Sequence, residues 1–170
     1  IFCVILFSAH VVHFSADLTS EKRHTLTEGS ILLMDELEED GHDVIITCYL
    51  TGDFPAQWKR LENSIREKLE EFAGASKNHL RFQFVDIYET DDLRSQGQNE
   101  EKLLEQGLAF SRIGYETGGG KTFRNIWPSA LISSGGKEVS VQFFRSETPQ
   151  PTEEMIQGSI NSIEYEIASS

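Results

Sequence analysis

The residues best placed for chemistry lie in a turn between a predicted strand and a predicted helix. The turn follows the run DVIITCYL and precedes QWKRLENSIREKLEEFA. Such turns are where many α/β proteins bind ligands or catalyse reactions. This one holds no cysteine pair, no glycine-rich phosphate loop and no nucleophile beside a base. We therefore expect no catalytic residue but a contact surface for a ligand or partner, with five predicted members: Asp53, Phe54, Pro55, Trp58 and Pro128.

The predicted surface combines apolar and polar side chains. Phe54 and Trp58 would supply apolar contact. Asp53 would either orient a polar group or cap the helix that starts near Pro55, and capping is the favoured role because aspartate accepts hydrogen bonds from the first helical amides.

A thiol reaction is the alternative chemistry. The two cysteines are Cys3 and Cys48, too few for a disulfide scaffold. Cys48 lies in the middle of a predicted strand, where a small buried hydrophobic role is expected. No second thiol lies near it in the sequence, so dithiol exchange would have no resolving partner. A thiol oxidoreductase that uses Cys48 is therefore kept as the rival to a binding function.

Other motifs do not predict a cofactor or a metal. The run GGGKT resembles the end of a phosphate-binding loop, but Tyr115 stands where that loop requires glycine and the following TFRNIWPS does not read as a helix. The acidic residues from Asp86 to Asp92 do not match a calcium loop and are expected to be solvated. The five histidines are scattered without cysteine or carboxylate at ligand spacing.

The net charge of the chain limits the classes of partner that we expect it to bind. Its 170 residues carry a formal net charge of −13. A nucleic-acid-binding protein needs a basic surface, so nucleic acid is not an expected partner. The same charge disfavours peripheral binding to anionic membranes.

The pattern of apolar residues predicts an α/β fold. Strands alternate with helices, which is typical of a mostly parallel sheet, and a hairpin adds antiparallel strands near the C-terminus. The expected elements are a helix from Thr25 or Thr27 to Gly41, a strand over 43–50, a helix that ends at Gly74, a strand over 80–87, a short helix over 100–106, a possible strand over 108–113, a hairpin over 126–144 and a helix from Thr152.

Two elements carry the predicted core. The strand over 43–50 is rich in apolar and β-branched residues, which predicts burial on both faces. The helix after the turn places its apolar residues three and four apart, so they share one face: Trp58, Leu61, Ile65, Leu69 and Phe72.

The segment Trp127-Pro128-Ser129 resembles the thioredoxin-like fold. In that fold a cis proline opens a strand and faces the turn that carries the active cysteines. The order of predicted elements agrees, and Asp53 to Ala56 would occupy the place of the redox pair. The resemblance implies a three-layer α/β sandwich with a mixed sheet that lacks a CxxC site. The sequence leaves open whether Pro128 is cis or trans.

Three runs are similar to the gliding-motility-associated ABC transporter substrate-binding (auxiliary) protein family. They are ADLTSEKRHTLTEGS (Ala16–Ser30), TCYLTGDFPAQWKRLENSIREKLEEF (Thr47–Phe72) and NSIEYEIASS (Asn161–Ser170). His24 departs from the aromatic residue expected there. The resemblance implies a non-enzymatic domain on the extracytoplasmic, periplasmic side of the inner membrane. It further implies a membrane anchor, a permease subunit as partner and, through the permease, a cytoplasmic ATPase.

The expected organisation has three parts. Residues 1–14 are apolar and uncharged, and as a helix they would span about 21 Å, short of the roughly 30 Å hydrocarbon core. They are either the tail of a membrane helix, as the resemblance implies, or a strand added to the sheet. Residues 15–150 would form the thioredoxin-like domain, and 151–170 would begin a connecting helix. Besides ligand or subunit binding, a purely structural docking role is the second alternative.

Overall fold

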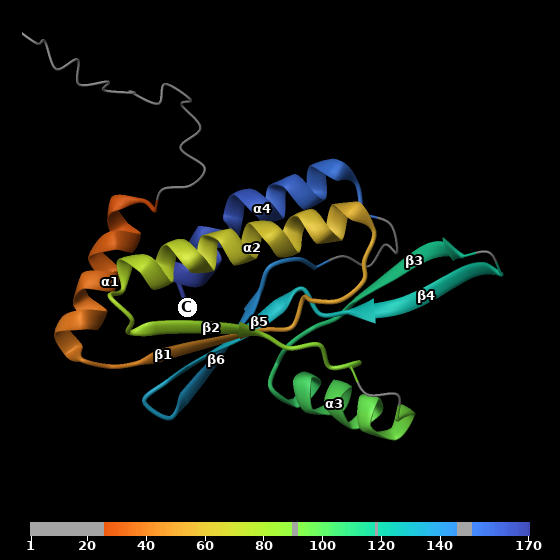
Figure 1. Ribbon diagram of the computed structural model, residues 1–170, viewed down its shortest axis with the longest axis horizontal. Helices are drawn as coiled ribbons and strands as arrows, with labels where there is room; N and C mark the ends of the chain where they lie inside the picture. Colours follow the sequence, from red (N-terminus) through yellow and green to blue (C-terminus); the bar gives the residue numbers. More distant parts are fainter. Residues whose placement is uncertain (1–25, 90–91, 118, 146–150) are drawn as a thin grey trace, which may run out of the picture.

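The computed structural model describes residues 26–89, 92–117, 119–145 and 151–170. These form a mixed α/β structure with a four-stranded sheet and a separate two-stranded hairpin (Figure 1). In chain order the elements are α1 (Glu28–Asp40), β1 (Val44–Cys48), α2 (Ala56–Ala75), β2 (Leu80–Phe84), α3 (Leu93–Glu105), β3 (Ser111–Thr117), β4 (Gly120–Ile126), β5 (Ser129–Ser134), β6 (Lys137–Gln142) and α4 (Glu153–Ala168).

The sheet has the strand order β2-β1-β5-β6. Strands β1 and β2 are parallel, whereas β5 is antiparallel to both β1 and β6. The predicted C-terminal hairpin is confirmed as β5 and β6, joined at Gly135 and Gly136. Both glycines have positive φ (57° and 80°), the conformation that a two-residue hairpin turn requires.

Helices α1, α2 and α4 lie on one face of the sheet and enclose the main core (Figure 1). The predicted apolar face of α2 is confirmed, because all five of its residues are buried. Burying each such side chain contributes about 1.5–3 kcal/mol to folding. α4 packs into the same core through Ile156, Ile163 and Ile167. The segment expected to begin a connecting helix is thus part of the domain core.

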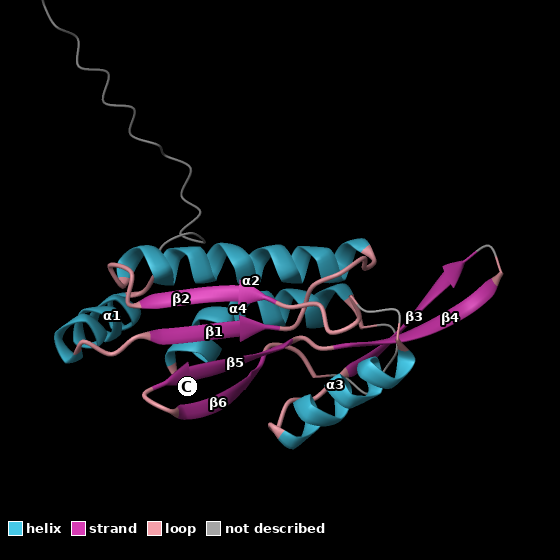
Figure 2. Cartoon of the chain, turned by 60° about the horizontal axis from the view of Figure 1, so that its bottom comes forward, coloured by secondary structure: helices cyan, strands magenta, loops and turns pink. Residues whose placement is uncertain are grey.

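The other face of the sheet is covered only in part. The prediction that β1 is buried on both faces is wrong: β1 is central in the sheet, yet Ile45 is 43% exposed. The single helix α3 lies towards this side (Figure 2). It is longer than expected and covers a second, small core of Ile87, Leu103, Leu108 and Trp127.

The ends of α1 and α4 follow from local capping. The side chain of Thr27 accepts a hydrogen bond from the Ser30 amide, and Gly41 (φ 67°) ends α1, both as predicted. Thr152 caps α4 in the same way. The expected stop of α2 at Gly74 is wrong by a short distance, because the helix continues to Ala75 and Ser76 follows as its C-cap.

The hairpin of β3 and β4 projects beyond the sheet (Figure 2). The sequence places a strand over 108–113, but β3 begins at Ser111 and β4 was not expected at all. The run of glycines lies at the turn of this hairpin, where only Gly118 falls outside the described residues.

The expected N-terminal membrane helix or added strand, residues 1–14, lies outside the described residues. Among the helices that the structure describes, none is long and apolar enough to cross a membrane.

Candidate functional site

The predicted contact turn is held in place by α2. Lys59 Nζ donates to the carbonyl of Gly52 at 3.1 Å, and Thr51 Oγ1 donates to Glu62 at 3.3 Å. Glu62 is itself buried and pairs with Lys59 at 2.6 Å and with Arg66 at 3.2 Å. The charges of Lys59 and Arg66 offset the cost of burying the Glu62 carboxylate. The turn is therefore fixed by a polar network beneath it.

Asp53 is exposed but does not cap α2. Pro55 is the N-cap residue, and no side chain makes a capping hydrogen bond there. The prediction that Asp53 caps this helix is wrong. The proline side chain has no oxygen to accept a hydrogen bond from the first helical amides, so the helix starts without a side-chain cap.

Trp58 and Pro128 lie beneath the turn and not on its surface. Trp58 is 1% exposed and packs edge-on against Phe144, with ring centroids 4.9 Å apart. Pro128 is buried, and its carbonyl accepts the amides of Phe143 at 2.9 Å and Phe144 at 3.3 Å. The structure therefore joins Trp58 to Pro128 through Phe144 and leaves the exposed Asp53 with the partly buried Phe54 at the surface.

The peptide bond before Pro128 is trans, and no described residue has a cis peptide bond. The amide of Tyr49 donates to the carbonyl of Ser129 at 3.0 Å, which extends the pairing of β1 with β5 to the residue directly after the proline. The feature by which Pro128 resembles the thioredoxin-like fold is therefore its position in the chain and not its isomer.

Cys48 is enclosed in the main core. Its side chain is fully buried, and burial raises the pKa of its thiol to about 12. A thiol with that pKa is protonated at neutral pH and is not a nucleophile. Cys48 is the only described cysteine, so the described residues contain no CxxC site.

A cluster that the sequence did not predict lies beside the turn. Arg124 of β4 stands 5.8 Å from the ring of Phe54 and 5.0 Å from the ring of Tyr88, and 3.9 Å from Asp86. Its members come from three separate segments, so no local spacing in the sequence joins them.

Tyr88 links this cluster to α3. Its hydroxyl donates a hydrogen bond to the carboxylate of Glu100 and accepts one from the indole N–H of Trp127 at 3.1 Å. Burial and the contact with Glu100 raise the pKa of Tyr88, so its hydroxyl stays protonated. Because these groups satisfy one another, we interpret the cluster as the anchor of α3 and not as a reactive site.

Two of the acidic residues of 86–92, Asp86 and Asp92, have structural partners, and Glu89 is exposed. Asp86 accepts the amide of Tyr88 at 2.9 Å, and Asp92 caps α3. Within the described part of the chain, no three ligand-type side chains gather as a metal site. The run GGGKT leads into β4 and not into a helix, so no helix N-terminus stands ready for a phosphate.

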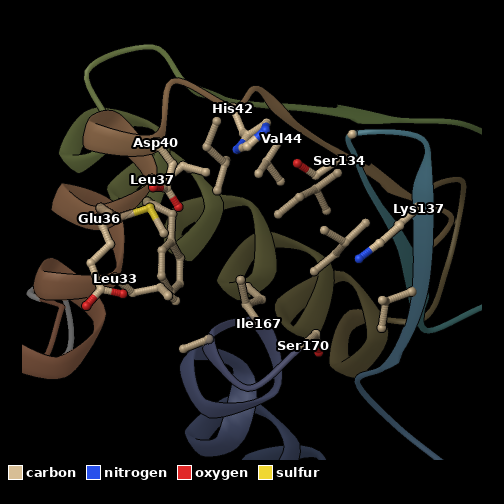
Figure 3. Close-up of a pocket in the computed structure, with 18 residues that line it drawn as sticks. Leu33, Glu36, Leu37, Asp40, His42, Val44, Ser134, Lys137, Ile167 and Ser170 are labelled. Atoms are coloured by element: carbon tan, nitrogen blue, oxygen red, sulfur yellow. The ribbon is translucent and has the colours of Figure 1, made fainter.

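An open groove lies at the other end of the sheet. This groove of about 540 Å³ lies between α1, the amino ends of β1 and β2, the β5–β6 turn and the end of α4. Figure 3 shows the residues that line it. Its walls are mainly apolar: Leu33, Met34, Leu37, Val44, Ile46, Phe72, Leu80, Ile132, Val139 and Ile167. Its volume is in the range of small-molecule and cofactor sites.

Charged side chains stand around this groove. Glu36 and Asp40 lie on the α1 side, and Lys137 lies on the β6 side (Figure 3). Among the described residues none of the three forms an ion pair, whereas Glu38 on the same helix pairs with Lys77. A mainly apolar lining with a few polar or charged groups is a usual form of a binding site.

The sequence signal for this groove was present but ambiguous. Leu33 and Leu37 belong to the apolar side of α1, and Ile132 and Val139 belong to the hairpin. Each pattern indicates packing against a core, and none shows that the neighbouring elements leave a space. The sequence therefore directed attention to the turn, about five strand residues or roughly 15 Å away along β1.

Comparison with known protein families gives a match over most of the chain. A family model described as a domain of unknown function, DUF7088, matches residues 20–133. No curated protein and no solved structure matches the chain.

Proposed function

The chain belongs to the DUF7088 family of domains of unknown function, and from that premise we propose that it is a non-enzymatic binding domain. Its ligand or partner subunit would occupy the groove between α1 and the β5–β6 hairpin. The observation that carries this proposal is the groove itself: about 540 Å³ of mainly apolar space, with the charged side chains of Glu36, Asp40 and Lys137 at its margin.

We further propose the setting in which this domain works. The runs Ala16–Ser30, Thr47–Phe72 and Asn161–Ser170 support an auxiliary, substrate-binding protein of an ABC transporter associated with gliding motility. The domain would be anchored to the inner membrane and face the periplasm. Its partner would be the permease subunit and, through it, the ATPase.

The fold supports a thioredoxin-like origin for this domain. The order of helices and strands agrees with that fold, and β5 follows Pro128 as expected. The trans bond before Pro128 and the absence of a CxxC site in the described chain depart from its redox members. We therefore propose a thioredoxin-like scaffold used for binding.

The two rival functions meet physical objections of different strength. The buried, protonated Cys48 counts strongly against a thiol oxidoreductase. A purely structural docking module is compatible with the sheet, but it gives no reason for an apolar groove with charged side chains at its margin.

Two substitutions on α1 test the proposal. Leu33 lines the groove and is 38% exposed, whereas Ile31 is 40% exposed on the same helix and does not line it. We expect Leu33→Asp to weaken co-purification with the permease subunit at least tenfold, and to abolish any melting-temperature increase produced by a small-ligand screen. Ile31→Asp is expected to leave both unchanged.

The proposal fails if the two variants behave alike. It also fails if neither the permease subunit nor any screened ligand binds the unmodified chain. A ligand that raises the melting temperature of the parent protein but not of Leu33→Asp would exclude the purely structural role.

A further inference from the structure

The hairpin of β3 and β4 extends from the body of the molecule as an arm, formed by Ser111–Thr117 and Gly120–Ile126 (Figure 2). In the described part of the chain, these two strands make a sheet of their own. A two-stranded hairpin is only marginally stable by itself. At the base of the arm, Ile113 and Ile126 belong to the main core. This packing at the base fixes the direction in which the arm extends.

One face of the arm presents an aromatic ring. The register places Gly114 opposite Phe123. A Cβ atom at Gly114 would come within 3.0 Å of the Phe123 ring, so the glycine leaves room for the ring to lie over the neighbouring strand. The guanidinium of Arg112 stands 5.2 Å from the ring centroid, and Phe123 is still 50% exposed. An exposed aromatic side chain held in this way is suited to enter an apolar site on another molecule.

Two charged residues lie on the same face, nearer the end of the arm. Glu116 of β3 is directly opposite Lys121 of β4, and both are exposed. The arm has three basic residues and one acidic residue, although the whole chain carries a net charge of −13. The arm is therefore a basic element of an acidic protein, and it fits a surface on which acidic groups predominate.

The groove of this chain has the complementary charges. Glu36 and Asp40 stand on its α1 side, and Lys137 stands on its β6 side (Figure 3). An arm that enters the groove can place Lys121 beside the two carboxylates of α1. Glu116, on the other strand of the arm, then faces Lys137. Both signs of charge at the margin of the groove thus find an opposite charge on the arm.

The arm and the groove lie at opposite ends of the molecule. The groove is beside α1, and β3 and β4 extend from the other end of the sheet (Figure 1). The arm therefore cannot reach the groove of its own chain, and a groove that it enters belongs to a second copy. The net negative charge makes two copies repel one another at long range. At about 0.15 M ionic strength, charges more than about 8 Å apart are largely screened, so the local charge pairs dominate.

We propose that the arm of one copy of this chain binds in the groove of another copy, with Phe123 against the apolar lining. This inference rests on the proposed function, which makes the groove a binding surface, and it adds a form of regulation. An arm in the groove and a permease subunit or ligand in the groove would exclude one another. Self-association would therefore control access to the groove.

Sedimentation velocity of the 170-residue chain at about 0.15 M salt measures this contact. We expect the parent to associate reversibly as its concentration rises. Phe123→Asp should weaken association at least tenfold, because it brings a carboxylate to an apolar site. Leu104→Asp should associate like the parent, because Leu104 is also 50% exposed but belongs to α3. Equal effects of the two substitutions, or a parent that stays monomeric up to about 1 mM, would overturn the inference.

A mixture of two variants identifies the two halves of the contact. Phe123→Asp alters the arm and keeps the groove, whereas Leu33→Asp alters the groove and keeps the arm. Each variant alone should associate at least tenfold more weakly than the parent. Their mixture should form a complex of nearly parental affinity, which would also show that both variants are folded. If the parent associates but the mixture does not, the arm and the groove are not partners.

Charge reversal tests how the arm is oriented. Lys121→Glu should weaken association at least fivefold, because it places a carboxylate beside those of α1. Adding Glu36→Lys to that variant restores the net charge of the parent and should recover most of the association. Adding Glu39→Lys gives the same net charge, but Glu39 does not line the groove, so association should stay weak. Equal recovery in the two double variants would overturn the pairing of Lys121 with the carboxylates of α1.

Further outcomes separate this inference from the proposed function. If Leu33→Asp weakens the permease interaction but the parent stays monomeric, self-association is wrong and the groove function stands. If Leu33→Asp leaves the permease interaction unchanged but the mixture of variants associates, the arm binds in the groove and the proposed function is wrong. An excess of the permease subunit should dissociate the copies from one another. A complex in which both contacts persist would overturn the competition for the groove.

Discussion

The side chain of Cys48 shows how burial decides chemistry at the scale of one residue. The thiol sits between β2 and β5 in the sheet and faces the main core, where no water reaches it. Removing a thiolate from water costs more than removing a thiol, so the pKa rises to about 12. The residue therefore acts as a small core hydrophobe.

We expect Cys48 to resist modification in the folded protein. In a Cys3→Ser background, a maleimide at pH 7.5 should label the native chain at least ~100-fold more slowly than the chain unfolded in denaturant, because only an accessible thiolate reacts. Mass spectrometry of timed samples measures both rates. Similar labelling rates in the native and unfolded states would contradict this expectation and would favour the thiol oxidoreductase function.

Single-residue predictions from the sequence succeeded where the role was local burial. The expectation that Cys48 is a core residue is confirmed. The role of Asp53 was wrong because a cap depends on which residue takes the N-cap position, and Pro55 takes it. The surface role of Trp58 depended on what covers it, and Phe144 lies 86 residues away in the sequence.

At the scale of elements, the position of α1 decides whether the groove exists. The carboxylate of Glu164 on α4 accepts the amide of Thr27 at 2.7 Å and the hydroxyl of Ser30 at 2.7 Å. Lys68 of α2 lies 3.6 Å from the same carboxylate. This junction fixes the start of α1, whose later residues form one wall of the groove.

Glu164→Ala is expected to lower the free energy of unfolding by about 1–2 kcal/mol at pH 7, since it removes two hydrogen bonds to a charged acceptor. Burial acts to raise the pKa of Glu164, but the bonds from Thr27 and Ser30 and the charge of Lys68 hold it below its ordinary value of 4.5. A lowered pKa in the folded state stabilises the protein above pH 4.5, and this contribution disappears as the pH falls below it.

Urea unfolding at several pH values measures this effect. The difference between the parent and Glu164→Ala should be full at pH 7 and should shrink as the pH falls below 4.5. Glu166→Ala, on the same helix, is the control and should change the free energy of unfolding by less than about 0.5 kcal/mol. A difference that stays constant down to pH 3 would contradict the role assigned to the ionised carboxylate.

Elements with a regular spacing of apolar residues could be predicted from the sequence. Which elements pack against one another could not. The apolar face of α2, the caps of α1 and α4 and the β5–β6 hairpin followed from spacing and turn residues. Strand β4 was missed because its polar sequence, GKTFRNI, pairs mainly with β3 and not with the core. The open face of β1 was missed because apolar content alone does not show which face a helix covers.

At the scale of the whole molecule, the predicted surface and the groove occupy opposite ends of the sheet. The turn follows the carboxyl end of β1, whereas Val44 and Leu80, at the amino ends of β1 and β2, line the groove. The general expectation for α/β folds favours the carboxyl ends. Here that end is filled by the mutually satisfied groups around Arg124 and Tyr88, and the open space lies at the other end.

The fold class was predictable from the order of elements, and the site was not. Alternating helices and strands with a final hairpin determine a mixed sheet. The groove depends on the distance between α1 and α4, which lie on the same face of the sheet. Tertiary contacts such as those of Glu164 set this distance. A single sequence carries no direct signal of that distance.

Hydrogen exchange of the chain with and without the permease subunit tests the central claim most directly, namely that the groove is the binding surface. The account predicts slower exchange on binding in α1 from Leu33 to Asp40 and in β6 (Lys137–Gln142), with no change over 51–55. Slower exchange over 51–55 with no change in α1 and β6 would contradict it and would return the binding surface to the turn.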